Sequence, residues 1–200
     1  IPIQNSSSND AVVLLGNLKN KEIIAQAFGE TRPISFIEIQ SYSKAILKQI
    51  FKQIEFTPNT QLVFCVDENL EWDKEDGIFS FQQRNIIGIT EVVQAVVELN
   101  LEVRLWCITK GAIAVTQQEV VSPLQHQIPA FVRILWNENF ELKPSVIDIE
   151  KSEDLLLLPN LLNQDNNENE IAIRDGQFYA TRLSHKLIAQ QHKSKVISKN

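Results

Sequence analysis

The chain has 200 residues with 19 basic and 25 acidic side chains, a formal net charge of −6, and 44% hydrophobic residues. This composition predicts an acidic globular protein with a hydrophobic core, and it argues against a surface that follows nucleic-acid phosphates. Neither a signal peptide nor an apolar run long enough to span a membrane is present, so we expect no membrane partner and a cytoplasmic location.

Strand-like and helix-like segments alternate along the chain. The strands are continuous apolar runs, and the helices carry apolar residues three or four positions apart. The predicted strands are 11–15, 34–39, 62–66, 101–109 and 145–149, with a short extension at 113–115. The predicted helices are 19–28, 43–54, 90–99, 122–135 and 154–162, and loops are expected at 67–77 and 163–170.

The fourth helix has a start signal and a breaker. Ser122 fits an N-cap and Pro123 the first helical position. Pro129 lies inside the same segment, and it should kink the helix or delay its start.

A β-hairpin closes the pattern, because Asp175-Gly176 separates the strand-like segments 171–174 and 177–182. This dipeptide accepts the positive φ values of a type I′ turn. The sequence therefore predicts an α/β fold, a doubly wound, mostly parallel, truncated Rossmann-like sheet with right-handed crossovers and a C-terminal β-hairpin. We expect a polar leader over 1–10, a single folded unit over 11–183, and a basic tail or linker over 184–200.

Phosphate-binding loops are missing from the sequence. The six glycines lie at least 11 residues apart, whereas dinucleotide-binding and P-loop motifs need glycines within five residues. Gly16-Asn17-Leu18-Lys19 follows the first strand, and we interpret it as a structural turn.

Residues for catalysis or metal binding are also not indicated. Six carboxylates between Asp67 and Asp76 lack calcium-loop spacing, and the three histidines lack zinc spacing. Tyr42 and Tyr179 are not followed four residues later by the lysine of short-chain reductases. Cys65 and Cys107 lie in strand-like runs and are expected to be buried free thiols. We therefore predict no catalytic, cofactor-binding or metal-binding residue.

Three later segments resemble one family. Residues 105–112, LWCITKGA, resemble "LWLVTRGA" in the structural subdomain of modular polyketide synthase ketoreductases. Arg133, Glu138 and residues 146–149 resemble the segment "GRV…EHPEL…LVDLD" of that subdomain. Residues 170–183 resemble its closing "ELAVR-G-VYVARL".

This resemblance implies a pseudo-Rossmann half that carries no cofactor and supports a neighbouring catalytic domain, so the chain alone would not be an enzyme. NADPH would enter only if a catalytic half follows. The implied partners are adjacent domains of the same synthase, such as a catalytic ketoreductase half, a methyltransferase or a dehydratase. The chain contains no methionine, and we infer a piece of a longer polypeptide.

The sequence departs from the family where Trp-Gly-x-Gly would fall on residues 129–132 and His-Pro on Asn139-Phe140. These changes favour a degenerate pseudo-ketoreductase. Two alternatives stay open: the first half of an active NADPH-dependent β-ketoreductase, and an independent small-molecule-binding domain. Arg133 and Glu138 are five residues apart, so we expect each to bond elsewhere. The candidate interface residues are Phe131, Arg133, Trp136, Glu138, Phe140, Phe178 and Tyr179.

Overall fold

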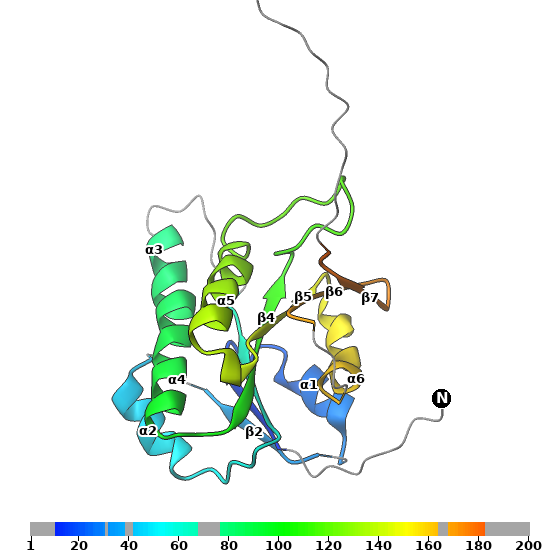
Figure 1. Cartoon of the computed structure of the whole chain (residues 1–200). Helices are drawn as coiled ribbons and strands as arrows, with labels where there is room; N and C mark the ends of the chain where they lie inside the picture. The colour runs from blue at the N-terminus through cyan, green and yellow to red at the C-terminus, as the bar shows by residue number, and fades with distance from the viewer. Residues whose placement is uncertain (1–10, 31, 39–41, 68–76, 164–167, 183–200) are drawn as a thin grey trace, which may run out of the picture.

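The computed structural model describes residues 11–30, 32–38, 42–67, 77–163 and 168–182 (Figure 1). The predicted leader over 1–10, the acidic loop after Asp67, part of the loop over 163–170 and the basic tail over 184–200 lie outside these residues.

The described residues form a seven-stranded sheet in the order β2-β1-β3-β4-β5-β6-β7. Every neighbouring pair is parallel except β6 and β7, which are antiparallel. The strands are β1 (Val12–Gly16), β2 (Ile34–Ile37), β3 (Thr60–Cys65), β4 (Val103–Lys110), β5 (Ser145–Ile149), β6 (Glu170–Arg174) and β7 (Gln177–Ala180). The chain moves outward from β1 to β2 and then returns past β1 to β3, so the carboxyl ends of β1 and β3 form the topological switch point.

Helices cover both faces of this sheet (Figure 1). One face carries α2 (Lys44–Phe51), α3 (Gly77–Phe81), the π-helical turn η1 (Gln82–Ile86), α4 (Ile87–Glu98) and α5 (Gln127–Glu138). The other face carries α1 (Lys21–Phe28), the 3₁₀ segment η3 (Ser152–Leu157) and α6 (Leu158–Leu162). A further 3₁₀ turn, η2 (Phe140–Leu142), precedes β5.

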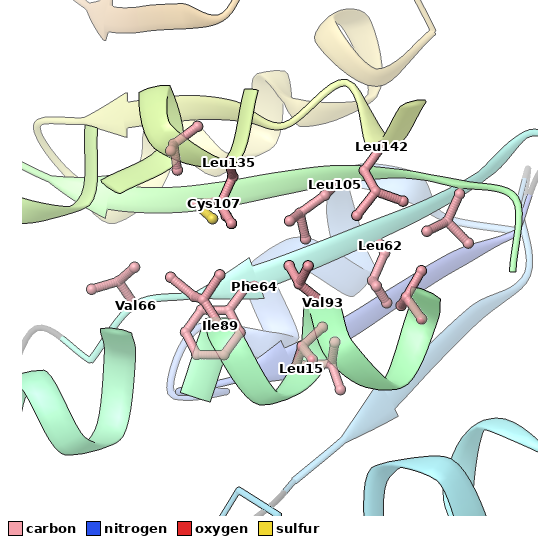
Figure 2. Close-up of a cluster of buried hydrophobic side chains, with 14 of the residues drawn as sticks. Leu15, Leu62, Phe64, Val66, Ile89, Val93, Leu105, Cys107, Leu135 and Leu142 are labelled. Carbon is pink, nitrogen blue, oxygen red and sulfur yellow. The ribbon is translucent and has the colours of Figure 1, made fainter. Parts of the chain in front are cut away.

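Two hydrophobic clusters fill the space between the sheet and these helices. Successive strand residues point to opposite faces, so Leu62 and Phe64 of β3 join the cluster under α4 and α5, while Val63 and Cys65 join the cluster under α1 and α6. Figure 2 shows the first cluster, in which Ile89 and Val93 of α4 lie against the strands. Burial on both faces explains why the strands are continuous apolar runs.

One crossover differs in hand from the others. The β3–β4 and β4–β5 connections place α4 and α5 on one face of the sheet. The β5–β6 connection proceeds in the same direction but places η3 and α6 on the opposite face, beside α1. The expectation that every crossover is right-handed is therefore wrong at this connection.

Four predicted elements also need correction. The helix expected at 90–99 begins at Gly77 and runs through α3, η1 and α4. Residues 113–115 form no strand, and the segment 154–162 is a 3₁₀ segment that leads into α6. The helix expected from Ser122 begins at Gln127, which places Pro129 in the first helical turn, where no intrahelical N–H donor is needed. A turn precedes it, and there the Gln125 N–H bonds the Ser122 hydroxyl at 3.4 Å.

The C-terminal hairpin agrees with its prediction. Asp175 and Gly176 have φ values of 49° and 72°, the positive φ values that a type I′ turn requires at both central residues. Each residue of β7 pairs with a residue of β6, from Gln177 opposite Arg174 to Ala180 opposite Ile171.

Candidate functional site

The switch point between β1 and β3 is the position where sheets of this type bind ligands. Gly16 ends β1 there with a φ of 100°, and a Cβ atom at this position would lie 2.2 Å from the Cys65 carbonyl oxygen. The glycine is thus required by the close approach of β1 to β3. This supports the interpretation of residues 16–19 as a structural turn.

Polar side chains from three segments meet at this switch point, and we call them the Asp67 cluster: Asn17, Asp67, Arg84 and Asn85. The Asp67 carboxylate accepts hydrogen bonds from the Asn17 amide at 3.0 Å and from the Arg84 guanidinium at 3.2 Å. The Asp67 N–H donates to the buried Asn85 side chain at 2.9 Å, and Asn85 donates to the Phe81 carbonyl at 3.1 Å. The π-helical turn η1 carries both Arg84 and Asn85 toward the ends of the strands.

A hollow of about 640 Å³ lies beside the Asp67 cluster. Its lining combines basic side chains with acidic ones, among them Lys19 and Lys21 against Glu38 and Asp67. Tyr42 also borders the hollow, and burial, together with the nearby Cys65 and Asp67, raises the pKa of its hydroxyl.

A second polar network joins the carboxyl ends of β4, β5 and β6. Asp148 is fully buried, and its carboxylate accepts hydrogen bonds from the Thr109 hydroxyl and the Ala112 N–H, each at 2.7 Å. Arg174 donates to the same carboxylate at 2.7 Å and to Glu119 at 3.0 Å. Although burial opposes its ionisation, hydrogen bonds from the Val115 N–H and Arg174 hold the pKa of Glu119 below its usual value. This network fixes the long β4–α5 connection to the sheet.

Both cysteines are free and buried, as predicted. Burial raises the pKa of each thiol to about 12, with a smaller contribution from Cys65 at Cys107. The two thiols lie in different clusters, on opposite faces of the sheet. No group of metal-ligating side chains occurs among the described residues, and no described helix has the length and apolar character to cross a bilayer.

An apolar groove of about 400 Å³ runs between the start of α4 and α5, and we call it the α4–α5 groove. Ile87 and Ile134 line it and are 41% and 51% exposed. Phe131 also lines the groove from α5, and a hydrogen bond between Gln82 and Gln127 at 3.1 Å bridges the two walls. The remaining lining residues are Ile86 and Ala130.

A pocket of about 430 Å³ lies on the other flank of α5. Arg133 and Trp136 of α5 border it together with Glu170 at the start of β6. The Arg133 guanidinium binds the Glu170 carboxylate through two hydrogen bonds of 2.5 and 2.9 Å, so Arg133 bonds away from Glu138, as expected. Glu138 is exposed at the end of α5.

The candidate interface residues therefore occupy separate surfaces. Phe131 lines the α4–α5 groove, whereas Arg133 and Trp136 line the opposite flank of α5. Phe140 is 69% exposed on η2, and Phe178 and Tyr179 are 42% and 43% exposed on β7. Sequence reasoning did not single out Ile86, Ile87 or Ile134, although Ile134 lies three residues after Phe131, one helical turn further along α5, which is a usable signal.

Comparisons with known proteins agree with this architecture. The chain is 35% identical over 82 residues, 40% of its length, to a phenolphthiocerol/phthiocerol polyketide synthase protein of Mycobacterium tuberculosis (strain ATCC 25618 / H37Rv), and it spans 4% of that protein. A solved structure of A-type ketoreductases from a modular polyketide synthase superimposes with a TM-score of 0.71 at 19% identity, over 95% of this chain and 42% of that one. The chain has a ketoreductase-like fold.

A second ketoreductase structure, of the A1 type, supports this assignment with a TM-score of 0.70 at 20% identity, covering 93% of this chain and 40% of that one. No family model matches the chain. The resemblance of the sequence to polyketide synthase ketoreductases is confirmed at the level of fold, as is the mostly parallel α/β sheet with its hairpin.

Proposed function

We propose that this chain is a non-catalytic structural subdomain of a cytoplasmic polyketide synthase, which holds a neighbouring catalytic domain in place during polyketide biosynthesis. The observation that carries the proposal is the α4–α5 groove. Ile87, Phe131 and Ile134 bring apolar surface together on two adjacent helices, and such a patch on a small protein marks a contact with another protein.

The altered segment 129–132 strengthens this proposal. The family's Trp-Gly-x-Gly falls on residues that include Ala130 and Phe131, and both line the groove. Because this surface differs from that of the family in the segment 129–132, we infer that it contacts a neighbour other than the usual catalytic half of a ketoreductase. This favours a degenerate pseudo-ketoreductase.

The switch point supports a chain that carries no cofactor of its own. Phosphate groups need backbone N–H groups that they can approach closely, and glycines usually provide that access. Here Asn17 and Asp67 bond each other at the strand ends, and Gly16 is the single glycine among the described residues that line the hollow. We expect no NADPH binding in a titration of the 200-residue chain, and micromolar binding would contradict the proposal.

The groove is tested in the longer synthase polypeptide of which we infer this chain to be a piece, called here the parent polypeptide. A protease site is placed in its segment 184–200. We expect the two cleaved parts of the wild type to elute together on size exclusion and those of Phe131→Ala/Ile134→Ala to separate. Ile46→Ala is the matched control, because Ile46 is 47% exposed on α2 and does not line the groove. The proposal would be overturned if the two wild-type parts eluted separately, or if the two parts of the groove variant eluted together as those of the wild type do.

The second candidate is the supporting first half of an active NADPH-dependent β-ketoreductase. The similarity to A-type and A1-type ketoreductases, of which the chain covers 42% and 40%, favours it specifically. Sequencing the transcript past Asn200 distinguishes the two. A glycine-rich nucleotide loop with downstream Ser and Tyr would indicate a reductase, whereas a methyltransferase or another domain would indicate a scaffold without its own reductase.

A further inference from the structure

β7 is the last strand of the sheet, so the backbone N–H and C=O groups on its outer side have no partner strand among the described residues. In an antiparallel pair, alternate residues direct their N–H and C=O groups toward the partner strand and the others direct them away. The Thr181 N–H bonds the Glu170 carbonyl at 3.4 Å, so the same alternation directs Tyr179 and Gln177 toward β6. The backbone groups of Phe178 and Ala180 therefore point outward, away from the sheet.

Neither proline nor charge blocks strand addition at this edge, which is four residues long. Proteins protect edges with proline or with charged side chains. The other edge strand, β2, is preceded directly by Pro33 and followed directly by Glu38. No proline or charged residue occurs between Gly176 and Thr181.

Two aromatic side chains flank the same edge, one on each face of the sheet. Phe178 pairs with Ile173, which belongs to the cluster under α1 and α6, whereas Tyr179 pairs with Ala172 on the opposite face. They are 42% and 43% exposed, which is the kind of half-covered aromatic surface that a further strand would bury.

We infer that the outer edge of β7 pairs with an extended segment of the neighbouring domain of the same synthase, which adds an eighth strand to the sheet. This inference rests on the proposed function. The partner segment is uncharged and carries apolar side chains on both of its faces, to meet Phe178 and Tyr179.

The position at which the chain leaves the sheet, directly after β7, favours a segment of the neighbouring domain as the partner strand. Two hydrogen bonds from Arg182 to Glu168, of 2.6 and 2.5 Å, hold the end of β7 against the start of β6. Residues 183–200 follow, and 18 residues reach at most about 60 Å when extended. Polypeptide that continues beyond Asn200 therefore starts within reach of the β7 edge.

Hydrogen–deuterium exchange tests the pairing at single amides. In the 200-residue chain we expect the Phe178 and Ala180 amides to exchange quickly and the Tyr179 amide, which faces β6, to exchange slowly. In the parent polypeptide the Phe178 and Ala180 amides should slow by about tenfold or more. Equal exchange rates in both proteins would overturn the inference.

Ala180→Pro provides the matched variant, because it removes an outward N–H that no other described residue accepts. It should leave the melting temperature of the 200-residue chain unchanged and abolish the slowing of the Phe178 amide in the parent. Tyr179→Pro is the control, since it removes a hydrogen bond to β6 and should lower that melting temperature.

The outcomes separate this inference from the proposed function. If the groove variant releases the neighbouring domain while Phe178 and Ala180 exchange at equal rates in both proteins, the scaffold stands and the strand addition is wrong. Protection that appears in the 200-residue chain and grows with its concentration would show pairing between two copies, which also overturns the inference.

Discussion

Asp148 holds three parts of the chain together with a single carboxylate. One of its oxygens accepts from Thr109 and from the Ala112 N–H, and the other accepts from Arg174 and, at 3.1 Å, from the Ile113 N–H. A charge with no solvent exposure is stable only while all of these partners remain. The side chain therefore connects the end of β5 with β4, β6 and the β4–α5 connection.

We predict that Asp148→Asn lowers the free energy of unfolding by about 3 kcal/mol, because it leaves Glu119 as the remaining counterion of the buried Arg174 and places an amide among hydrogen-bond donors that need an acceptor. Urea denaturation measures this loss. Glu168→Gln, which breaks an exposed pair with Arg182, is the control and should change the midpoint little. Similar midpoints for the two variants would show that the buried network adds no stability.

At the scale of elements, the β6–β7 hairpin depends on its turn. Gly176 has a φ of 72°, a conformation that costs a residue with a Cβ atom about 1–2 kcal/mol. Gly176→Ala should therefore lower the thermal midpoint by several degrees. Asp175→Asn is the control, because asparagine tolerates positive φ as well as aspartate does. An unchanged midpoint for Gly176→Ala would mean that the turn relaxes without cost.

The hairpin and the buried strands could be predicted from the sequence because their signals are local. A two-residue Asp-Gly turn and continuous apolar runs each lie within about ten residues. The helix from Gly77 was missed because polar residues at 82–85 and Gly88 interrupt its apolar pattern, and the π-helical turn η1 shifts the helical period by one residue. Gly88 belongs in this helix because Tyr42 packs against it, and a Cβ atom there would lie 2.9 Å from the Tyr42 ring.

The candidate site was harder to predict, since its parts come from distant segments. The α4–α5 groove joins residues near position 86 to residues near position 131, and the Asp67 cluster joins positions 17, 67 and 84. The sequence singled out Phe131, Trp136 and Phe140 together as aromatic residues that flank the altered helix. Only the direction of each side chain around α5 shows that they serve opposite flanks.

At the scale of the whole molecule, the ion pairs of Lys44 and Lys48 on α2 with Glu98 on α4 make the free energy of unfolding depend on pH. Hydrogen bonds from Lys44 and Lys48 lower the pKa of Glu98 to about 2. A lowered pKa in the folded state means that the stabilisation is present above the ordinary glutamate range and is lost as the pH falls from about 4.5 toward about 2.

We predict that Glu98→Gln makes the unfolding free energy fall less steeply than that of the wild type between these pH values. Thermal unfolding at a series of pH values measures the slopes. Glu102→Gln, at an exposed carboxylate ahead of β4, should keep the wild-type slope. Parallel curves for all three proteins would rule out the coupling of α2 to α4 through Glu98.

The opposite hand of the β5–β6 crossover shapes the surface beside α5. Because η3 and α6 lie over the α1 face, α5 is the last described helix on its own face, and the sheet continues past it through β6 and β7. On this side of the molecule, the flank of α5 with Arg133 and Trp136 lies beside the outer part of the sheet, and the two border the pocket of Arg133 and Trp136. On the α5 face, β6 and β7 therefore lie uncovered by any described helix.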